Sequence, residues 1–315
     1  MDYILLLLGF VLLIKGADFA VSGGTGIAEF FRISPVIIGL TVIAFGTSLP
    51  EAAVSVTGSI SGQSGIAVGN VLGSNIFNLL VVGGFSAVLS PMAVDKILLK
   101  RDLPVSLLAV AFVLVFTGVS FIGGHSEVTI GRLGGVILLA VFTVFMAMLL
   151  IEAKKDRAAN EAPAEPERSL LMNFVFTIGG LVAIVFGSDL VVDSATRIAY
   201  SFGLSETFVG LTIVSIGTSL PELVTSMVAA KKGSNEIAMG NIVGSNIFNL
   251  LFVLGLATVI APVTIPTYLF IDALVLTVVT VFAMIFCRDK NLGRKEGAVF
   301  LLLYAAYFAY IFIRG

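Results

Sequence analysis

The sequence has few of the residues that metal centres and many enzymes depend on. Its 315 residues include one cysteine, Cys287, one histidine, His125, and no tryptophan. A single cysteine excludes an internal disulfide. Zinc, copper and haem sites usually need several His or Cys ligands, so we expect no bound cofactor. The sequence also lacks a Gly-x-Ser-x-Gly or His-Glu-x-x-His element, which makes an enzyme such as an intramembrane hydrolase a remote alternative.

Charged residues are scarce as well. They make up 12% of the chain, whereas a soluble domain carries about a quarter. The formal net charge of −2 gives no basic field that would attract nucleic acid. Instead, 58% of the residues are hydrophobic and long apolar runs recur from end to end. Because a helix needs roughly 20 apolar residues to span a bilayer, the length is enough for about ten membrane helices.

The apolar runs fall into two groups that one polar stretch separates. We expect helices over residues 3–30, 36–60, 65–90, 103–121 and 129–151, and then over 170–201, 207–230, 235–260, 267–286 and 296–313. The polar stretch is rich in charged residues, proline and alanine, which is typical of a flexible linker. We therefore divide the chain into a first half, 1–151, a linker, 152–168, and a second half, 169–315.

The two halves are related by an internal repeat. Residues 36–80 align without gaps to residues 207–251, and 23 of these 45 positions are identical. An odd number of helices in each half means that the two copies insert in opposite directions. Inverted repeats of this kind are typical of secondary transporters, whose sites lie where the halves meet. The expected fold is an all-α membrane protein of ten transmembrane helices in two inverted five-helix repeats.

The distribution of basic residues predicts the orientation of the chain. Cytoplasmic loops of membrane proteins carry an excess of Lys and Arg. With ten helices, 14 of the 18 basic residues fall on one side, in the loops that contain Arg32, Lys96, Lys100, Arg101, Lys154, Lys155, Arg157, Arg168, Lys231, Lys232, Arg288, Lys290, Arg294 and Lys295. We place this side and the linker in the cytoplasm, both termini outside, and the chain in the cell (inner) membrane.

The motif Gly-Thr-Ser-Leu-Pro-Glu occurs once in each half and ends at Glu51 and Glu222. A charge at the bilayer centre costs about 2.5–3.5 kcal/mol on insertion scales, so a compensating interaction is expected. Pro50 and Pro221 each remove a helical hydrogen bond, and broken helices are tolerated in a membrane where they line a cavity. We therefore expect broken helices at the membrane midplane.

Oxygen atoms dominate this motif. Besides the carboxylates it offers freed carbonyls and the hydroxyls of Thr47, Ser48, Thr218 and Ser219. Clusters of oxygen ligands with carboxylates suit hard cations such as Ca²⁺. A structural alternative stays open, because Ser48 with Glu51, and Ser219 with Glu222, also fit a helix-capping box.

A second motif, Gly-Asn-x-x-Gly-Ser-Asn-Ile-Phe-Asn, starts 18 residues after each glutamate and ends at Asn78 and Asn249. Asparagine supplies a neutral oxygen ligand. A polar residue that recurs at the same position of both repeats, at membrane depth, favours ion binding. The glycines of the motif are explained as well by close helix packing, with asparagine hydrogen bonds between helices.

The doubled motifs resemble the two alpha-repeats of the sodium/calcium exchanger family, within the calcium/cation antiporters. The resemblance implies ten helices and four ion sites in a diamond at the midplane. In it, Glu51 and Glu222 bind Ca²⁺ with backbone oxygens of Thr47 and Thr218, and Asn78 and Asn249 complete the centre. The implied sodium sites are formed by Ser74, Ala44, Thr47 and Glu222, and by Ser245, Ser215, Thr218 and Glu51, while Ser48 and Ser219 lie beside the centre.

This chain departs from the family pattern at Asn249, where some microbial relatives carry aspartate. The departure leaves the ion stoichiometry and proton coupling open. The expected function is secondary active antiport of Na⁺ for Ca²⁺ by alternating access. The alternatives are H⁺/Ca²⁺ or other cation antiport, and a passive cation channel. The expected partners are these ions and the lipid bilayer, and the working expectation for the oligomeric state is a monomer.

Overall fold

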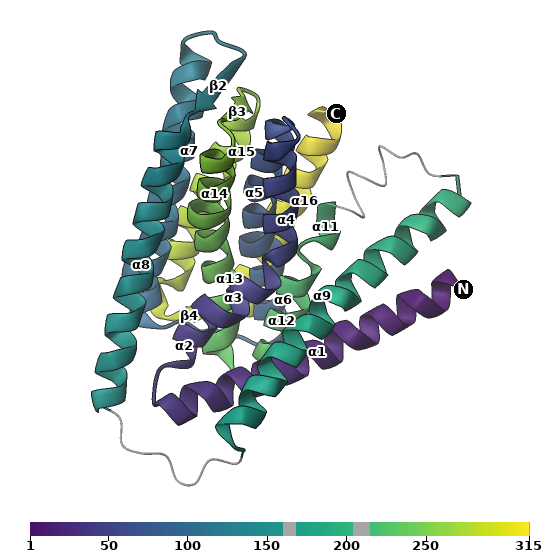
Figure 1. Cartoon of the computed structure of the whole chain (residues 1–315), viewed down its shortest axis with the longest axis vertical. Coiled ribbons are helices and arrows are strands. Elements are labelled where there is room, and N and C mark those ends of the chain that lie inside the picture. The colour runs from purple at the N-terminus through teal and green to yellow at the C-terminus, as the bar shows by residue number, and fades with distance from the viewer. Residues whose placement is uncertain (160–167, 204–214, 315) are drawn as a thin grey trace.

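The computed structural model describes residues 1–159, 168–203 and 215–314, and it is almost entirely helical (Figure 1). Its helical segments are α1 (Asp2–Phe31), α2 (Pro35–Ile38), η1 (Gly39–Ile43), α3 (Ala44–Thr47), α4 (Leu49–Ile60), α5 (Ser64–Phe77), η2 (Asn78–Val82), α6 (Gly83–Leu89), η3 (Leu98–Asp102), α7 (Leu103–Ile122) and α8 (Arg132–Ala159). The second half adds α9 (Leu170–Ser201), α11 (Ser215–Gly217), α12 (Leu220–Lys231), α13 (Asn235–Ile247), η5 (Phe248–Val253), α14 (Leu254–Ile260), α15 (Leu269–Phe286), η6 (Cys287–Asp289) and α16 (Arg294–Arg314).

Within the described residues, eight helices are long and apolar enough to cross a membrane, or nine if a bent pair is counted as one span. These helices follow the expected runs closely. The bent pair, Pro35–Thr47 with Leu49–Ile60, corresponds to the run expected over 36–60. The run expected over 207–230 lies partly outside the described residues, which include it only from Ser215 onward.

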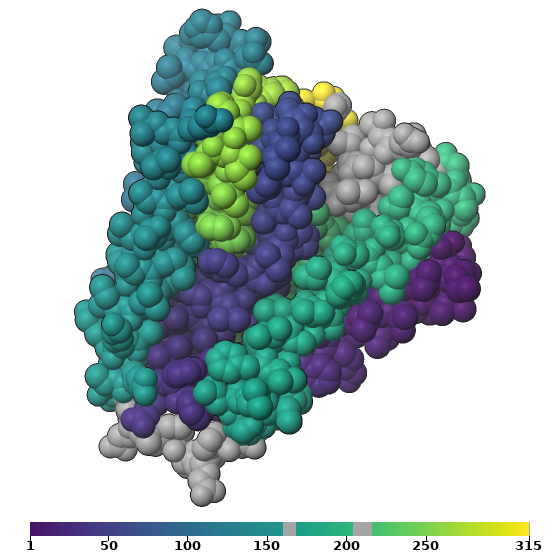
Figure 2. Space-filling model, in the orientation of Figure 1, coloured from purple at the N-terminus to yellow at the C-terminus, as the bar shows by residue number. Residues whose placement is uncertain are grey.

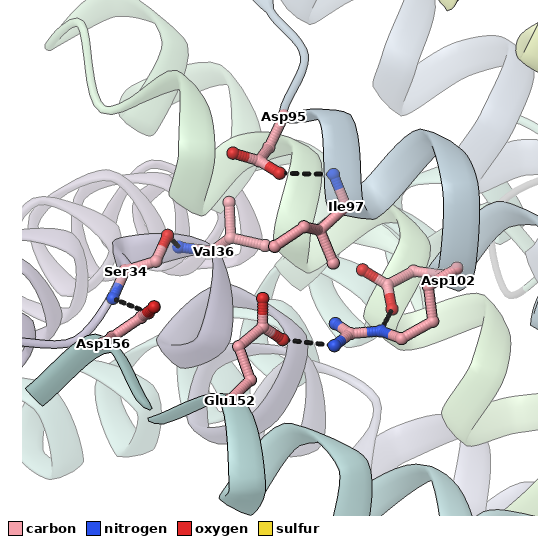
Figure 3. Close-up of polar contacts among 8 residues, drawn as sticks. Ser34, Val36, Asp95, Ile97, Asp102, Glu152 and Asp156 are labelled. Atoms are coloured by element: carbon pink, nitrogen blue, oxygen red, sulfur yellow. Dashed lines mark hydrogen bonds and ion pairs between the residues drawn. The ribbon is translucent and has the colours of Figure 1, made fainter. Parts of the chain in front are cut away.

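The helix expected over 129–151 is displaced at both ends. It begins at Arg132, and it continues to Ala159, eight residues into the predicted linker. Two contacts hold this extension, as Figure 3 shows: Arg101 forms an ion pair with Glu152, and the backbone N–H of Ser34 donates to Asp156 Oδ2 at 3.0 Å. Both carboxylates lie on α8, so they join its end to η3 and to the start of α2.

Four short strands occur in the loops, which the sequence did not predict. β1 (Met92–Ala93) pairs with β4 (Asn291–Leu292), and β2 (Glu127–Ile130) pairs with β3 (Val263–Pro266), both antiparallel. Each sheet therefore joins a loop of the first half to a loop of the second. β2 and β3 are rich in Val, Ile and Thr, which favour strands, but their apolar character merges with the neighbouring membrane helices in the sequence.

Helices α1 and α9 form a closely packed antiparallel pair at the side of the remaining helices (Figures 1 and 2). Small residues recur every seven positions along the contact. A Cβ atom added at Gly9 would lie 2.9 Å from the carbonyl oxygen of Gly187, and one at Gly16 would lie 2.8 Å from that of Gly180. Glycine permits this close approach of the two backbones.

The two helices that carry the second motif form the centre of the molecule. In each of the spans Ser64–Leu89 and Asn235–Ile260, 83% of an 18-residue apolar segment is buried inside the protein. In the other continuous spans, at most 39% of such a segment is buried. Each central span also contains a wide π-helical turn, η2 or η5, at its asparagine. π-turns inside α-helices occur frequently at functional sites, and these two bring Asn78 and Asn249 into the middle of the core.

Candidate functional site

The two glutamates lie in the first turns of helices that start at a break. At Ser48, where α3 ends and α4 begins, the chain bends by 52°. Ser219, which precedes α12, has nearly the same backbone angles as Ser48 (φ −95° and ψ 6°, against φ −88° and ψ 11°). Pro50 and Pro221 take the second position of their helices, where a missing N–H is tolerated. The two copies of the motif therefore have the same backbone conformation at the serine that precedes α4 or α12.

Each glutamate receives a hydrogen bond from the opposite half of the chain. The hydroxyl of Ser48 donates to Glu222 Oε1 at 2.6 Å, and the hydroxyl of Ser219 donates to Glu51 Oε1 at 3.0 Å. Both carboxylates are fully buried. Neither serine hydroxyl makes a capping hydrogen bond to its own helix in the described part of the chain, so the capping-box alternative does not describe this site.

The serines of the second motif complete these two clusters. Ser245 donates to Glu222 Oε1 at 3.3 Å, and Ser74 shares a 3.2 Å hydrogen bond with Ser219, which in turn donates to Glu51. The structure thus brings together the serines that the family resemblance implies as sodium ligands and the glutamates that it implies as calcium ligands.

The asparagines that end the second motif are fully buried and have spare polar atoms. Asn249 donates from Nδ2 to Asn75 Oδ1 at 3.3 Å, while its own Oδ1 has no partner among the described residues. Asn78 has no partner there for either Oδ1 or Nδ2. These unpaired amide oxygens are the atoms that a cation would need.

The remaining predicted residues lie next to the breaks. Thr47 is buried, and its hydroxyl donates to the carbonyl of Ala44 at 3.3 Å and to Asn241 Oδ1 at 3.1 Å. Thr218 follows α11 and its hydroxyl lacks a partner within the described ranges. Ser215 is the first residue of α11, and the position of its side chain lies outside the described part of the structure.

Two further pairs of asparagines belong to this network, and the sequence assigned them no individual roles. Asn75 and Asn246 exchange hydrogen bonds across the halves. Asn70 donates to Ser55, and Asn241 donates to Ser226, both at 3.0 Å. The internal repeat could have identified them, because all of these residues, including both serines, are identical between its two copies.

The unpaired atoms define what the site can bind. Six oxygens of the two motifs are buried and lack hydrogen-bond partners in the described residues: Glu51 Oε2, Glu222 Oε2, Asn78 Oδ1, Asn246 Oδ1, Asn249 Oδ1 and Thr218 Oγ1. A buried polar atom without a partner costs about 1–3 kcal/mol, and a charged one costs more. Carboxylate, amide and hydroxyl oxygens are ligands that hard cations prefer. The geometry therefore suits a metal cation that binds through oxygen.

The chain is similar to known proteins over nearly its whole length. A family model described as sodium/calcium exchanger protein matches residues 1–151 and 172–313. The inner membrane protein YrbG of Escherichia coli is 37% identical over 306 residues, which cover 94% of this chain and 92% of that protein. The sodium/calcium exchanger MaX1 of Methanosarcina acetivorans is 33% identical over an alignment of 344 positions, which includes 99% of this chain and 98% of that one.

The fold is also that of a solved transporter. A structure of the sodium-calcium exchanger NCX_Mj superimposes with a TM-score of 0.84 at 33% identity and covers 98% of both chains. The family model covers both halves of the repeat, and the relatives align from one end to the other. This chain therefore belongs to the sodium/calcium exchanger family, a family of transporters.

Proposed function

We propose that this protein is a secondary antiporter that exchanges Na⁺ for Ca²⁺ across a membrane by alternating access. The observation that carries the proposal is the pair of buried glutamates, Glu51 and Glu222, each held by a serine of the opposite half and each with one unpaired oxygen. Relatives that are named sodium/calcium exchangers and that align along the whole chain support the choice of ions.

The ligand set proposed for Ca²⁺ consists of the two glutamate carboxylates, the side-chain oxygens of Asn78 and Asn249, and the backbone oxygens of Thr47 and Thr218. Ca²⁺ takes six to eight oxygen ligands in flexible geometry, which agrees with this mixture of carboxylate, amide and carbonyl groups. Ser48 and Ser219 hold the carboxylates in place through their hydrogen bonds.

The two sodium sites proposed at either end of this centre each combine residues from both motifs. One consists of Ala44, Thr47, Ser74 and Glu222, and the other of Ser215, Thr218, Ser245 and Glu51. Both contain a glutamate that also belongs to the calcium centre, so Na⁺ and Ca²⁺ compete for the same carboxylates.

Shared carboxylates give a physical reason for obligatory exchange. Two ionised glutamates carry two negative charges, which one Ca²⁺ or two Na⁺ would neutralise. Without a cation, two like charges stay in a region of low dielectric, where their repulsion is strong. An empty site therefore meets a high free-energy barrier when its access changes from one side of the membrane to the other. The change of access takes place when ions fill the site.

The proposed topology has ten spans in two inverted five-helix repeats, 1–151 and 169–315, with 152–168 as a cytoplasmic linker and both termini outside. Its support is the odd number of expected helices in each half and the basic residues on the linker side. The relative YrbG is named an inner membrane protein, and we propose the same membrane here. We also propose that one chain suffices for transport, because both glutamates and their serine partners come from a single chain.

The test is uptake of ⁴⁵Ca²⁺ into vesicles that contain the purified protein, with an outward gradient of Na⁺, K⁺ or H⁺. We expect rapid uptake with the Na⁺ gradient and little with the other two. Equal uptake with a pH gradient alone would favour H⁺/Ca²⁺ antiport. Uptake that ignores the counter-ion would favour a passive channel, and both results would contradict the proposal.

A further inference from the structure

A side-chain amide has one end that can bind a cation and one end that repels it. Asn78 and Asn249 can serve as ligands only when their oxygens, rather than their NH₂ groups, face the site. A carboxylate at the same position would need no such control, because both of its ends are oxygen. Two asparagines in a cation site therefore require something that sets the direction of each amide.

In the structure, Asn75 sets the direction of Asn249. Asn249 Nδ2 donates to Asn75 Oδ1 at 3.3 Å, which leaves Asn249 Oδ1 unpaired and buried. Asn75 is itself fixed, because its Nδ2 donates to the backbone carbonyl of Asn246 at 3.3 Å. A backbone carbonyl can only accept hydrogen bonds. It therefore requires the NH₂ end of Asn75, which presents the Asn75 oxygen to Asn249 and directs the oxygen of Asn249 away from the pair.

The repeat-related pair, Asn246 and Asn78, contains the same chemical groups. Asn246 Nδ2 donates to the backbone carbonyl of Asn75 at 3.2 Å, so the direction of this amide is fixed in the same way. Asn246 Oδ1 and Asn78 Nδ2 are both buried and have no partner among the described residues. The repeat aligns Asn246 with Asn75 and Asn78 with Asn249, so this free acceptor and this free donor occupy the positions that correspond to the bond between Asn75 and Asn249.

We propose that Asn75 and Asn246 are positioning residues for cation binding. Each is held by a backbone carbonyl of the other half, and each turns the amide oxygen of a ligand, Asn249 or Asn78, toward the cation. This inference rests on the proposed function, because it assumes that Asn78 and Asn249 bind the transported ion. The proposal also predicts that this orienting contact is needed only where the cation ligand is an amide.

A merely structural role would be different. Asn75 and Asn246 also connect α5 to α13, and deleting either side chain would weaken that contact whatever residue stands at position 249. An orienting role depends on the ligand: it matters when residue 249 is asparagine and loses its purpose when residue 249 is aspartate. A double-mutant cycle separates the two roles.

The experiment measures equilibrium ⁴⁵Ca²⁺ binding to the purified protein, together with KM for Ca²⁺ in Na⁺-driven uptake. Four forms are compared: wild type, Asn75→Ala, Asn249→Asp and the double variant. We expect Asn75→Ala to weaken Ca²⁺ binding by about tenfold in the wild-type background and by less than about threefold in the Asn249→Asp background. Asn173→Ala, which removes a buried amide of α9 outside the site, is the matched control and should leave Ca²⁺ binding unchanged.

An equal loss of affinity in both backgrounds would overturn the proposal and leave Asn75 with a structural role only. If Asn75→Ala does not fold, the mirror cycle of Asn246→Ala with Asn78→Asp applies the same criterion to the repeat-related pair. The binding measurement does not depend on transport. A wild-type protein that binds Ca²⁺ but shows no Na⁺-driven uptake would therefore contradict the proposed function, while the cycle would still decide the role of Asn75.

Discussion

At the scale of single residues, Asp272 is a buried carboxylate that belongs to no part of the proposed ion site. Its side chain accepts two hydrogen bonds from Arg314 Nη1, at 3.0 and 2.8 Å, and one from the Tyr307 hydroxyl at 3.0 Å. Arg314 also lies over the rings of Tyr268 and Tyr310. These contacts attach the end of α16 to the start of α15.

We expect Arg314→Gln to destabilise the protein, because it leaves the charge of Asp272 buried without its cation. Removing one partner of a buried ion pair costs about 3–5 kcal/mol. The added substitution Asp272→Asn should recover much of the loss, since it removes the uncompensated charge. Thermal unfolding can be followed with a thiol-reactive dye, because Cys287 is buried and is the only thiol in the chain. An unchanged midpoint for Arg314→Gln, or no recovery in the double variant, would refute this account.

At the scale of helices, the contact between α1 and α9 depends on the glycine face. A Cβ atom at Gly180 would lie 2.5 Å from the backbone nitrogen of Ala20 and 2.5 Å from the carbonyl oxygen of Gly16. At the adjacent Gly179, an added Cβ atom would have no atom of another helix within 4 Å among the described residues. Two neighbouring glycines of one helix thus differ in packing and share the same backbone conformation.

We expect Gly180→Ala to lower the unfolding midpoint and the rate of Na⁺-driven Ca²⁺ uptake, because the added methyl group forces the two helices apart. Gly179→Ala is the matched control, and it should be neutral or slightly stabilising. Both substitutions gain the same helix propensity, about 1 kcal/mol, so the difference between them reports packing alone. Similar behaviour of the two variants in thermal unfolding would show that the close contact is not required.

The elements also differ in how well the sequence revealed them. Membrane helices were predictable because a bilayer demands long apolar runs, and the breaks were predictable from Pro50 and Pro221. The strand over Glu127–Ile130 was not, because pairing with Val263–Pro266 depends on a contact between distant loops. The end of α8 was also missed, because its contacts with Arg101 and Ser34 stabilise a polar segment that resembles a linker in the sequence.

Within the site, the sequence identified the ligand candidates but not their connections. The repeat singled out Glu51 and Glu222, because charge inside an apolar run is rare. It did not show that Ser48 donates a hydrogen bond to the glutamate of the other half, or that Asn75 orients Asn249. Both contacts join helices whose relative positions do not follow from the linear pattern of the sequence.

At the scale of the whole molecule, the distribution of basic residues predicts which end of the helices faces the cytoplasm. In a Cys287→Ser background, we expect His125→Cys to react with a membrane-impermeant maleimide in intact cells or spheroplasts. Lys154→Cys should react only after the membrane is permeabilised, because α8 ends on the linker side. Both positions are exposed in the structure, so accessibility depends on the side of the membrane. The reverse labelling pattern would show that the chain is inserted with the opposite orientation.

The central claim is that the two buried glutamates together bind the exchanged cations. Its most direct test is Na⁺-gradient-driven ⁴⁵Ca²⁺ uptake by vesicles that contain Glu51→Gln or Glu222→Gln. Each substitution keeps the size of the side chain and removes its charge, so uptake should fall at least about tenfold, which corresponds to about 1.4 kcal/mol. Glu127→Gln, at an exposed carboxylate of β2, is the control and should retain uptake. Near-normal exchange by either Glu51→Gln or Glu222→Gln would contradict the account.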